Sequence, residues 1–68
     1  MNKILAELRK AAGLTQQKAA NALRVDIRTY RRWELGETSL DNLSRRRKED
    51  IVNLFGKQAE SLFKSHEG

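Results

Sequence analysis

Residues 15–36 have the sequence TQQKAANALRVDIRTYRRWELG, which contains two helical segments separated by a short turn. Thr15 and Asp26 each precede a run of helix-forming residues, and both are of the type that caps the N-terminus of a helix. Gly36 follows the second run, where a glycine commonly ends a helix. We therefore predict two helices joined by a turn, a helix-turn-helix unit, over residues 15–23 and about 27–35.

The geometry of this unit predicts its core. A helix-turn-helix needs a small residue where its helices cross, which Ala20 supplies, and an apolar residue in the turn, which Val25 supplies. Tyr30 and Trp33 are the large apolar residues of the second helix and stand at helical spacing. The complete set of expected core residues is Leu8, Ala20, Leu23, Val25, Tyr30 and Trp33.

Burial of Tyr30 and Trp33 determines which face of the second helix is exposed, because successive helical residues are rotated by about 100°. The exposed face presents Ile27, Arg28, Arg31 and Arg32, with Thr29 near its edge. Arginines on one face of a short helix repel one another in water, whereas phosphates and guanine edges bind guanidinium groups. This face therefore predicts contact with the major groove of DNA.

The segments on both sides of the unit also have helical patterns. Residues 2–12 are expected to form an amphipathic first helix that ends at Gly13 and buries Ile4, Leu5, Leu8 and Ala12. A fourth element is expected to begin at Ser39 or Ser44 and to run to about Phe55, with an apolar face formed by Ile51, Val52, Leu54 and Phe55. The same stripe continues through Ala59, Leu62 and Phe63, and the pattern leaves open whether Gly56 separates two helices or lies within one.

No segment alternates polar and apolar residues as a β-strand does, and the chain of 68 residues contains no proline. We expect an all-α fold, a compact bundle of about five short helices with the helix-turn-helix in helices 2–3. Residues 1–64 are expected to form one domain, in which residues 50–64 are a C-terminal helical dimerisation segment. Residues 65–68 are expected to be a frayed tail.

Basic residues are concentrated in the first two thirds of the chain. The net charge of +5 divides into +3 over residues 1–23, +4 over residues 24–48 and −2 over residues 49–68, so a polyanion would bind the first two segments. The chain has no cysteine and no apolar run of membrane-spanning length, and we expect a soluble cytoplasmic protein that does not contact a membrane. The single histidine, His66, has no partner for nucleophilic or metal chemistry, and we expect no enzyme activity, metal or cofactor.

The spacing of particular residues resembles that of a known family. The chain resembles the Xre-type helix-turn-helix domain of lambdoid phage repressors and Cro proteins at Leu8-Arg9, Gly13-Leu14-Thr15-Gln16, Ala20, Leu23, Val25 and Thr29-Tyr30-Arg31-Arg32-Trp33-Glu34-Leu35-Gly36. This resemblance covers about residues 4–36. It implies a lambda repressor-like fold in a bacterial or phage regulator that binds double-stranded DNA as a homodimer at the nucleoid.

The resemblance also implies roles for individual residues. Ile27, Arg28 and Arg32 match base-contacting positions, where arginine would bind guanine and Ile27 would pack on a thymine methyl group. Arg9 and Glu34 match a structural pair that joins the first helix to the end of the third. The expected contacts with the DNA backbone are Gln16, Gln17, Thr29, Arg31, Arg45, Arg46, Arg47 and Lys48.

The chain departs from the family's pattern at Arg24 and at Ile27, which is apolar where members often carry a hydrogen-bonding side chain. The run at residues 45–48 needs an explanation of its own. Arg24 stands where family members usually have a glycine, so it either bears a strain of about 1 kcal/mol in a left-handed conformation or marks an altered turn. The run from Arg45 to Lys48 places four cations in the first turn of a helix, where they oppose the helix dipole. Contact with the sugar-phosphate backbone explains this placement, and a solvated basic surface is the alternative.

The C-terminal stripe has two interpretations, and the function has three. Phe55, Ala59, Leu62 and Phe63 are candidates for a dimer interface, and the alternative is that this segment folds back over the first helix. The leading hypothesis for function is a dimeric repressor that binds a two-fold symmetric operator. The alternatives are an antitoxin that holds a toxin through residues 50–65 and a helical adaptor that binds an acidic protein.

Overall fold

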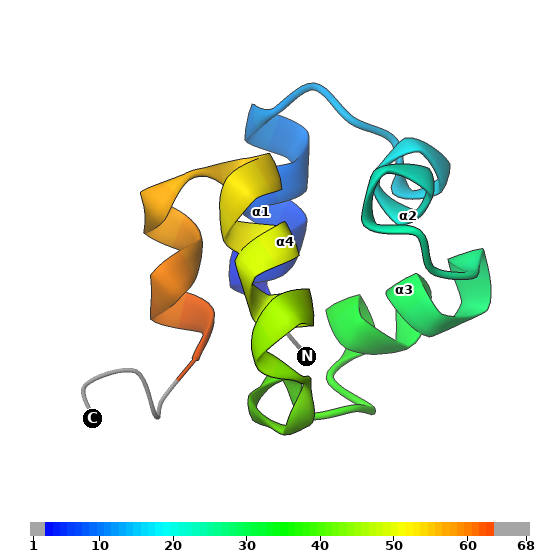
Figure 1. Ribbon diagram of the computed structural model, residues 1–68. Coiled ribbons are helices and arrows are strands. Elements are labelled where there is room, and N and C mark those ends of the chain that lie inside the picture. Colours follow the sequence, from blue (N-terminus) through cyan, green and yellow to red (C-terminus); the bar gives the residue numbers. More distant parts are fainter. Residues whose placement is uncertain (1–2, 64–68) are drawn as a thin grey trace.

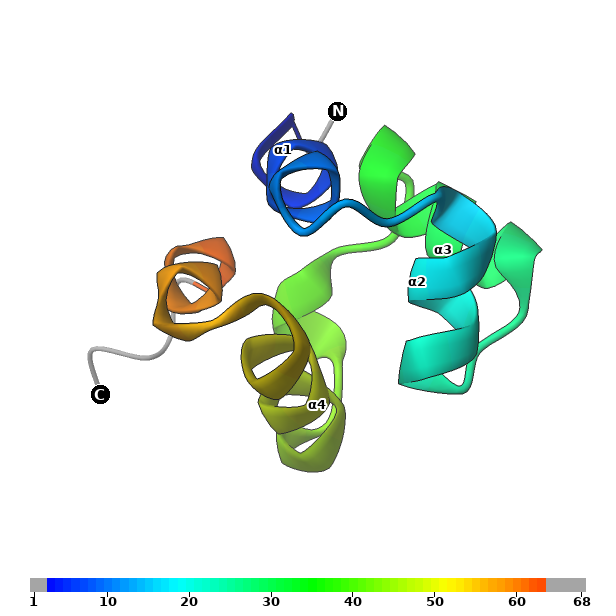
Figure 2. The same ribbon diagram turned by 90° about the horizontal axis from the view of Figure 1, so that it is seen from above.

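The computed structural model describes residues 3–63 (Figure 1). Their helices are α1 (Lys3–Ala11), α2 (Gln16–Leu23), α3 (Ile27–Leu35), the 3-10 helix η1 (Leu40–Asn42), α4 (Arg45–Phe55) and the 3-10 helix η2 (Lys57–Leu62). The α2–α3 pair lies on one side of the bundle and η2 on the opposite side, with α1 and α4 between them (Figures 1 and 2). The prediction of an all-α bundle is confirmed. The expected tail, with His66, lies outside the described residues.

Short side chains determine where the helices of the helix-turn-helix begin. Thr15 Oγ1 accepts a hydrogen bond from the Lys18 amide at 3.1 Å, and Asp26 Oδ2 accepts one from the Arg28 amide at 3.0 Å. Gly36 ends α3 in the left-handed conformation with φ of 81°. These bonds satisfy backbone groups that have no partner within the helix, so the boundaries follow from local sequence.

Replacing Thr15 with alanine is expected to lower the free energy of unfolding by about 1 kcal/mol, because the Lys18 amide loses its hydrogen-bond acceptor. Urea denaturation followed by circular dichroism measures this change. Thr15→Ser is the matched control, because it keeps the hydroxyl oxygen and should retain most of the stability. Equal losses in both variants would mean that the methyl group of Thr15, rather than its hydroxyl, stabilises the start of α2.

The segment after α3 contains two helical starts and a break. Ser39 caps η1 through the Asp41 amide at 3.3 Å, and Ser44 caps α4 through the Arg47 amide at 3.2 Å. Gly56, with φ of 94°, ends α4, and η2 follows it. Both serines therefore begin a helix, and Gly56 separates two helices.

The core lies where α1, α2, α3, α4 and η2 meet. Tyr30 and Trp33 are buried and contact each other edge to face, with ring centroids 6.0 Å apart. Of the expected core residues, Ala20 and Leu23 are also buried, whereas Leu8 and Val25 are only partly buried at the margin. The buried apolar residues are Leu5, Ala19, Ala20, Leu23, Tyr30, Trp33, Leu40, Ile51, Ala59 and Phe63.

Two residues of the expected inner face of α1 are exposed instead. Ile4 has 47% of its surface exposed, and Ala12 lies beyond the end of α1 and is also exposed. Only Leu5 of that set is fully buried. The expectation that Ile4 and Ala12 are buried is wrong, because the neighbouring elements cover a narrower face of α1 than the apolar residues of the sequence occupy.

The C-terminal stripe packs inside the domain. η2 packs against both α1 and α4, and this placement buries Ala59 completely and leaves 4% of Phe63 exposed. The expectation that Ala59 and Phe63 form a dimer interface is therefore wrong, because a partner cannot contact residues that the domain's own core covers. Phe55 and Leu62 are partly buried. No helix within residues 3–63 has the length and apolar character needed to cross a bilayer.

Candidate nucleic-acid interface

The outer face of α3 is cationic. Arg28, Arg31 and Arg32 are exposed on it, as is Thr29, while Tyr30 and Trp33 on the opposite face are buried. The side chains of Arg28 and Arg32 make no hydrogen bond or ion pair with any residue between 3 and 63, so both guanidinium groups are available to a ligand. They are one helical turn apart and project on the same side.

Two apolar residues of α3 differ from the expectation. Ile27, expected on the exposed face, is partly buried and packs against the core. Leu35 is 53% exposed and was not predicted as a surface residue of this face. Its spacing could have revealed it, because Leu35 lies seven residues after Arg28 and four after Arg31, which is the repeat of one helix face.

A chain of polar contacts joins α1, α2 and α3. Arg9 Nε donates to Glu34 Oε2 at 2.7 Å, and Arg9 Nη1 donates to the Leu14 carbonyl at 3.0 Å. Gln16 Nε2 donates to Glu34 Oε1 at 3.0 Å, and Arg31 Nε donates to Gln16 Oε1 at 3.4 Å. The structure thus brings Arg9 and Glu34 together and links them through Gln16 to the exposed face of α3.

The charges of the Arg9–Glu34 pair stabilise each other at a largely buried position. Glu34 is 8% exposed and the Arg9 side chain is 13% exposed. Burial acts to raise the pKa of Glu34, but hydrogen bonds from Arg9 and Gln16 outweigh it and hold that pKa below its ordinary value. The hydrogen bond to Glu34 raises the pKa of Arg9. The pair is therefore ionised at neutral pH, and each partner depends on the other.

The Tyr30 hydroxyl lies beside this pair. Burial raises the pKa of Tyr30 well above its ordinary value, so the phenol is neutral. Its oxygen is buried and has no hydrogen-bond partner of acceptable geometry among residues 3–63. The ring of Tyr30 packs in the core, and its hydroxyl also helps to lower the pKa of Glu34.

The glutamines at the start of α2 are both engaged within the protein. The amide of Gln16 bridges Glu34 and Arg31, as described above, and Gln17 Nε2 donates to Asn21 Oδ1 at 3.0 Å. Gln17 is exposed, whereas Gln16 is partly buried. Sequence reasoning placed both on DNA and did not predict these internal bonds.

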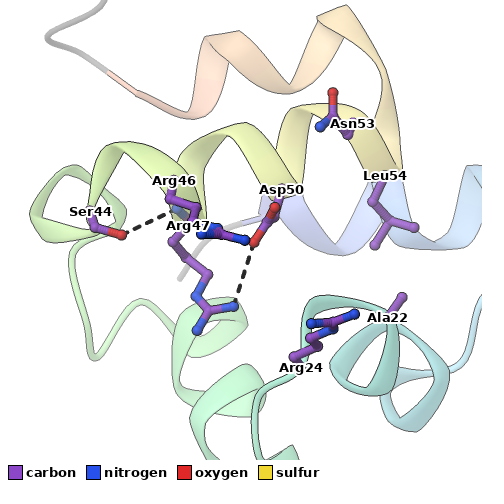
Figure 3. A pocket seen from close by; sticks show the side chains of 8 residues that line it. All are labelled: Ala22, Arg24, Ser44, Arg46, Arg47, Asp50, Asn53 and Leu54. Atoms are coloured by element: carbon purple, nitrogen blue, oxygen red, sulfur yellow. Dashed lines mark hydrogen bonds and ion pairs between the residues drawn. The ribbon is translucent and has the colours of Figure 1, made fainter.

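The basic run at the start of α4 divides into two pairs. Arg45 and Arg46 are exposed. Arg47 is partly buried, donates to the Leu23 carbonyl and lies 3.8 Å from the Asp50 carboxylate (Figure 3). Lys48 is partly buried, and its ammonium group lies 5.5 Å from the centre of the Phe63 ring. The prediction from the sequence placed all four cations on the DNA backbone. In the structure, Arg47 and Lys48 make contacts within the domain.

Comparison with protein families decides the classification. A family model described as helix-turn-helix matches residues 5–45, from α1 through the first residue of α4. The chain belongs to the Xre/Cro/C1-type helix-turn-helix family. No curated protein and no solved structure matches the chain.

Membership in the Xre/Cro/C1-type family assigns this domain a general function, DNA binding in transcription regulation. The matched segment contains both helices of the helix-turn-helix and the Arg9–Glu34 pair. Most of α4 and all of η2 lie beyond it, so their roles must be inferred from their own contacts. Within residues 3–63, no group of three or more potential metal ligands comes together.

Proposed function

We propose that this Xre-type protein is a sequence-specific repressor that binds a two-fold symmetric operator through the major groove. The observation that supports this proposal is the state of Arg28 and Arg32. Both are exposed one turn apart on α3, and neither is bound by a carboxylate within the described residues. Guanidinium groups in this arrangement can each donate two parallel hydrogen bonds to guanine O6 and N7.

The neighbouring residues have complementary roles in the proposal. Arg28 and Arg32 contact bases, and the partly buried Ile27 offers the edge of its side chain to a thymine methyl group. Gln17, Thr29, Arg31, Arg45 and Arg46 contact the sugar-phosphate backbone, which positions the domain without discriminating sequence. Two copies of the domain bind half-sites about 34 Å apart, one turn of the DNA helix.

Selection of bound sequences from a random pool of DNA duplexes tests the proposal. The expected result is a two-fold symmetric consensus with guanine at defined positions in each half-site, because one recognition helix contacts each half. An asymmetric consensus would contradict the dimer. Recovery of no enriched sequence would exclude sequence-specific binding and favour a protein-binding adaptor.

A further inference from the structure

An open cleft lies between the turn that follows α2 and the outer side of α4 (Figure 3). Its volume is about 620 Å³. Arg24 approaches from the turn, and Arg46, Arg47 and Asp50 approach from α4. No residue of α3 lines the cleft, so it is separate from the face that presents Arg28 and Arg32.

The charges in the cleft are not balanced. Arg47 is occupied by the Leu23 carbonyl and by Asp50, which is the one carboxylate in the cleft. Arg24 and Arg46 are exposed and make no side-chain hydrogen bond or ion pair with the part of the chain that the structure describes. Two uncompensated guanidinium groups border one hollow, and an anion entering it would relieve their repulsion.

The left-handed backbone conformation of Arg24 is unusual for an arginine and indicates that its side chain has a function. Arg24 has φ of 61° and is the non-glycine residue with positive φ in residues 3–63. Its amide caps α2 by donating to the carbonyls of Ala20 and Asn21, a role that requires the left-handed conformation and no side chain. Glycine would adopt this conformation without strain. An arginine at this position strains the turn and places a cation in the cleft.

We propose that the cleft is a binding site for the DNA backbone, in which Arg24 and Arg46 together contact one phosphate group. This inference rests on the proposed function and adds Arg24 to the residues that contact DNA. Arg24 stands three residues before the first residue of α3, and Ser44 and Arg46 stand at the start of α4, so the lining of the cleft reaches the beginnings of the two helices expected to border the groove. Phosphate is the anion that DNA supplies there, and its contact with arginine is independent of base sequence.

The test compares the wild-type protein with Arg24→Gly over a range of salt concentrations, on its selected operator and on unrelated DNA. Loss of one phosphate contact in each protomer, two in the dimer, makes the slope of log affinity against log salt shallower by about 1.8, and weakens binding at 0.1 M salt by about 60-fold on both DNAs. The same variant melts about 4 to 8 °C higher, because glycine relieves the strain of the left-handed turn. If the variant binds DNA more weakly although it is more stable, the loss of binding comes from a missing contact of Arg24 with DNA and not from a damaged fold.

Two control variants sharpen the comparison. Arg24→Lys keeps the charge and the strain, so it should retain most of the wild-type slope and the wild-type melting temperature. Lys57→Gln removes one charge from an exposed position on η2, away from the cleft, and should leave the slope unchanged. A slope that falls equally in Lys57→Gln and Arg24→Gly would overturn the proposal, because net charge alone would then explain it.

The failure of this inference can be distinguished from failure of the proposed function. If the wild-type protein selects no DNA sequence, the proposed function fails before any variant is measured. If the wild type binds its operator and Arg24→Gly keeps the full salt slope, the phosphate-binding role of the cleft is excluded. The proposed function is then unaffected. The cleft would then be available to an acidic segment of a protein partner. Loss of the slope in Arg24→Lys as well would also overturn the proposal.

Discussion

Replacing both Arg28 and Arg32 with alanine is expected to remove most of the preference of the protein for its operator over unrelated DNA. Each bidentate contact between arginine and guanine contributes about 1–3 kcal/mol of discrimination, so the double variant loses about 2–6 kcal/mol in each half-site. The domain stays folded, because neither side chain bonds to another residue of the described chain. Binding titrations on both DNAs at fixed salt measure the ratio of affinities.

The matched control replaces Lys10 and Lys18, two exposed lysines outside α3, with alanine. It removes the same charge at positions with no assigned base contact, so any change in affinity should be the same on both DNAs and leave their ratio unchanged. If the arginine variant also weakens both by one factor, Arg28 and Arg32 contact the backbone, and the assignment of base contacts is wrong.

Replacing Glu34 with glutamine is expected to lower the free energy of unfolding by about 1.5–3 kcal/mol, because the partly buried Arg9 guanidinium loses its counter-charge and a charge-assisted hydrogen bond. Glutamine has nearly the same volume, so the loss reflects charge rather than packing. This is a large share of the stability of a small domain, which is about 5–15 kcal/mol. Urea denaturation followed by the fluorescence of the single Trp33 measures it.

Two further sets of variants show whether the loss of stability in Glu34→Gln comes from the lost charge. Glu37→Gln removes an exposed carboxylate and should change stability by less than about 0.5 kcal/mol. Arg9→Met combined with Glu34→Leu removes both charges and should recover much of the loss. If that double variant is no more stable than Glu34→Gln, the hydrogen bonds that it also loses, from Arg9 to the Leu14 carbonyl and from Gln16 to residue 34, offset the gain from removing the unpaired charge.

The same pair makes stability depend on acid. The pKa of Glu34 is lower in the folded protein than its ordinary value of 4.5, so the ionised carboxylate stabilises the fold above that pH. The contribution is lost as the pH falls through the lowered pKa and the folded protein must take up a proton. Glu34→Gln should therefore show a weaker loss of stability in acid than the wild type does.

Local signals in the sequence predicted the helix boundaries well. Thr15, Asp26 and Ser44 each cap a helix through a bond to a residue two or three positions later, and such bonds depend only on neighbouring residues. Helical spacing also predicted the burial of Tyr30 and Trp33. These two kinds of information are sufficient to orient the exposed face of α3.

Contacts between distant segments could not be predicted in the same way. An apolar stripe shows that a helix face is buried but not which segment packs against it. The sequence therefore predicts that Ala59 and Phe63 contact a second copy, whereas they lie in the domain's own core. A charge pattern likewise does not name its partner. The Leu23 carbonyl that binds Arg47 lies 24 residues away in the sequence, and the Phe63 ring close to the Lys48 ammonium group follows η2, outside α4.

The helix-turn-helix is bound to the rest of the domain at two places, by Arg9 at the end of α3 and by Arg47 at the end of α2, next to the turn. Neither of these contacts uses Arg28 or Arg32. Arg28 and Arg32, which we propose to contact bases, can therefore be exchanged without disturbing the contacts that hold α3 in place. A new target could evolve by substitution at these two positions alone, at little cost to the fold.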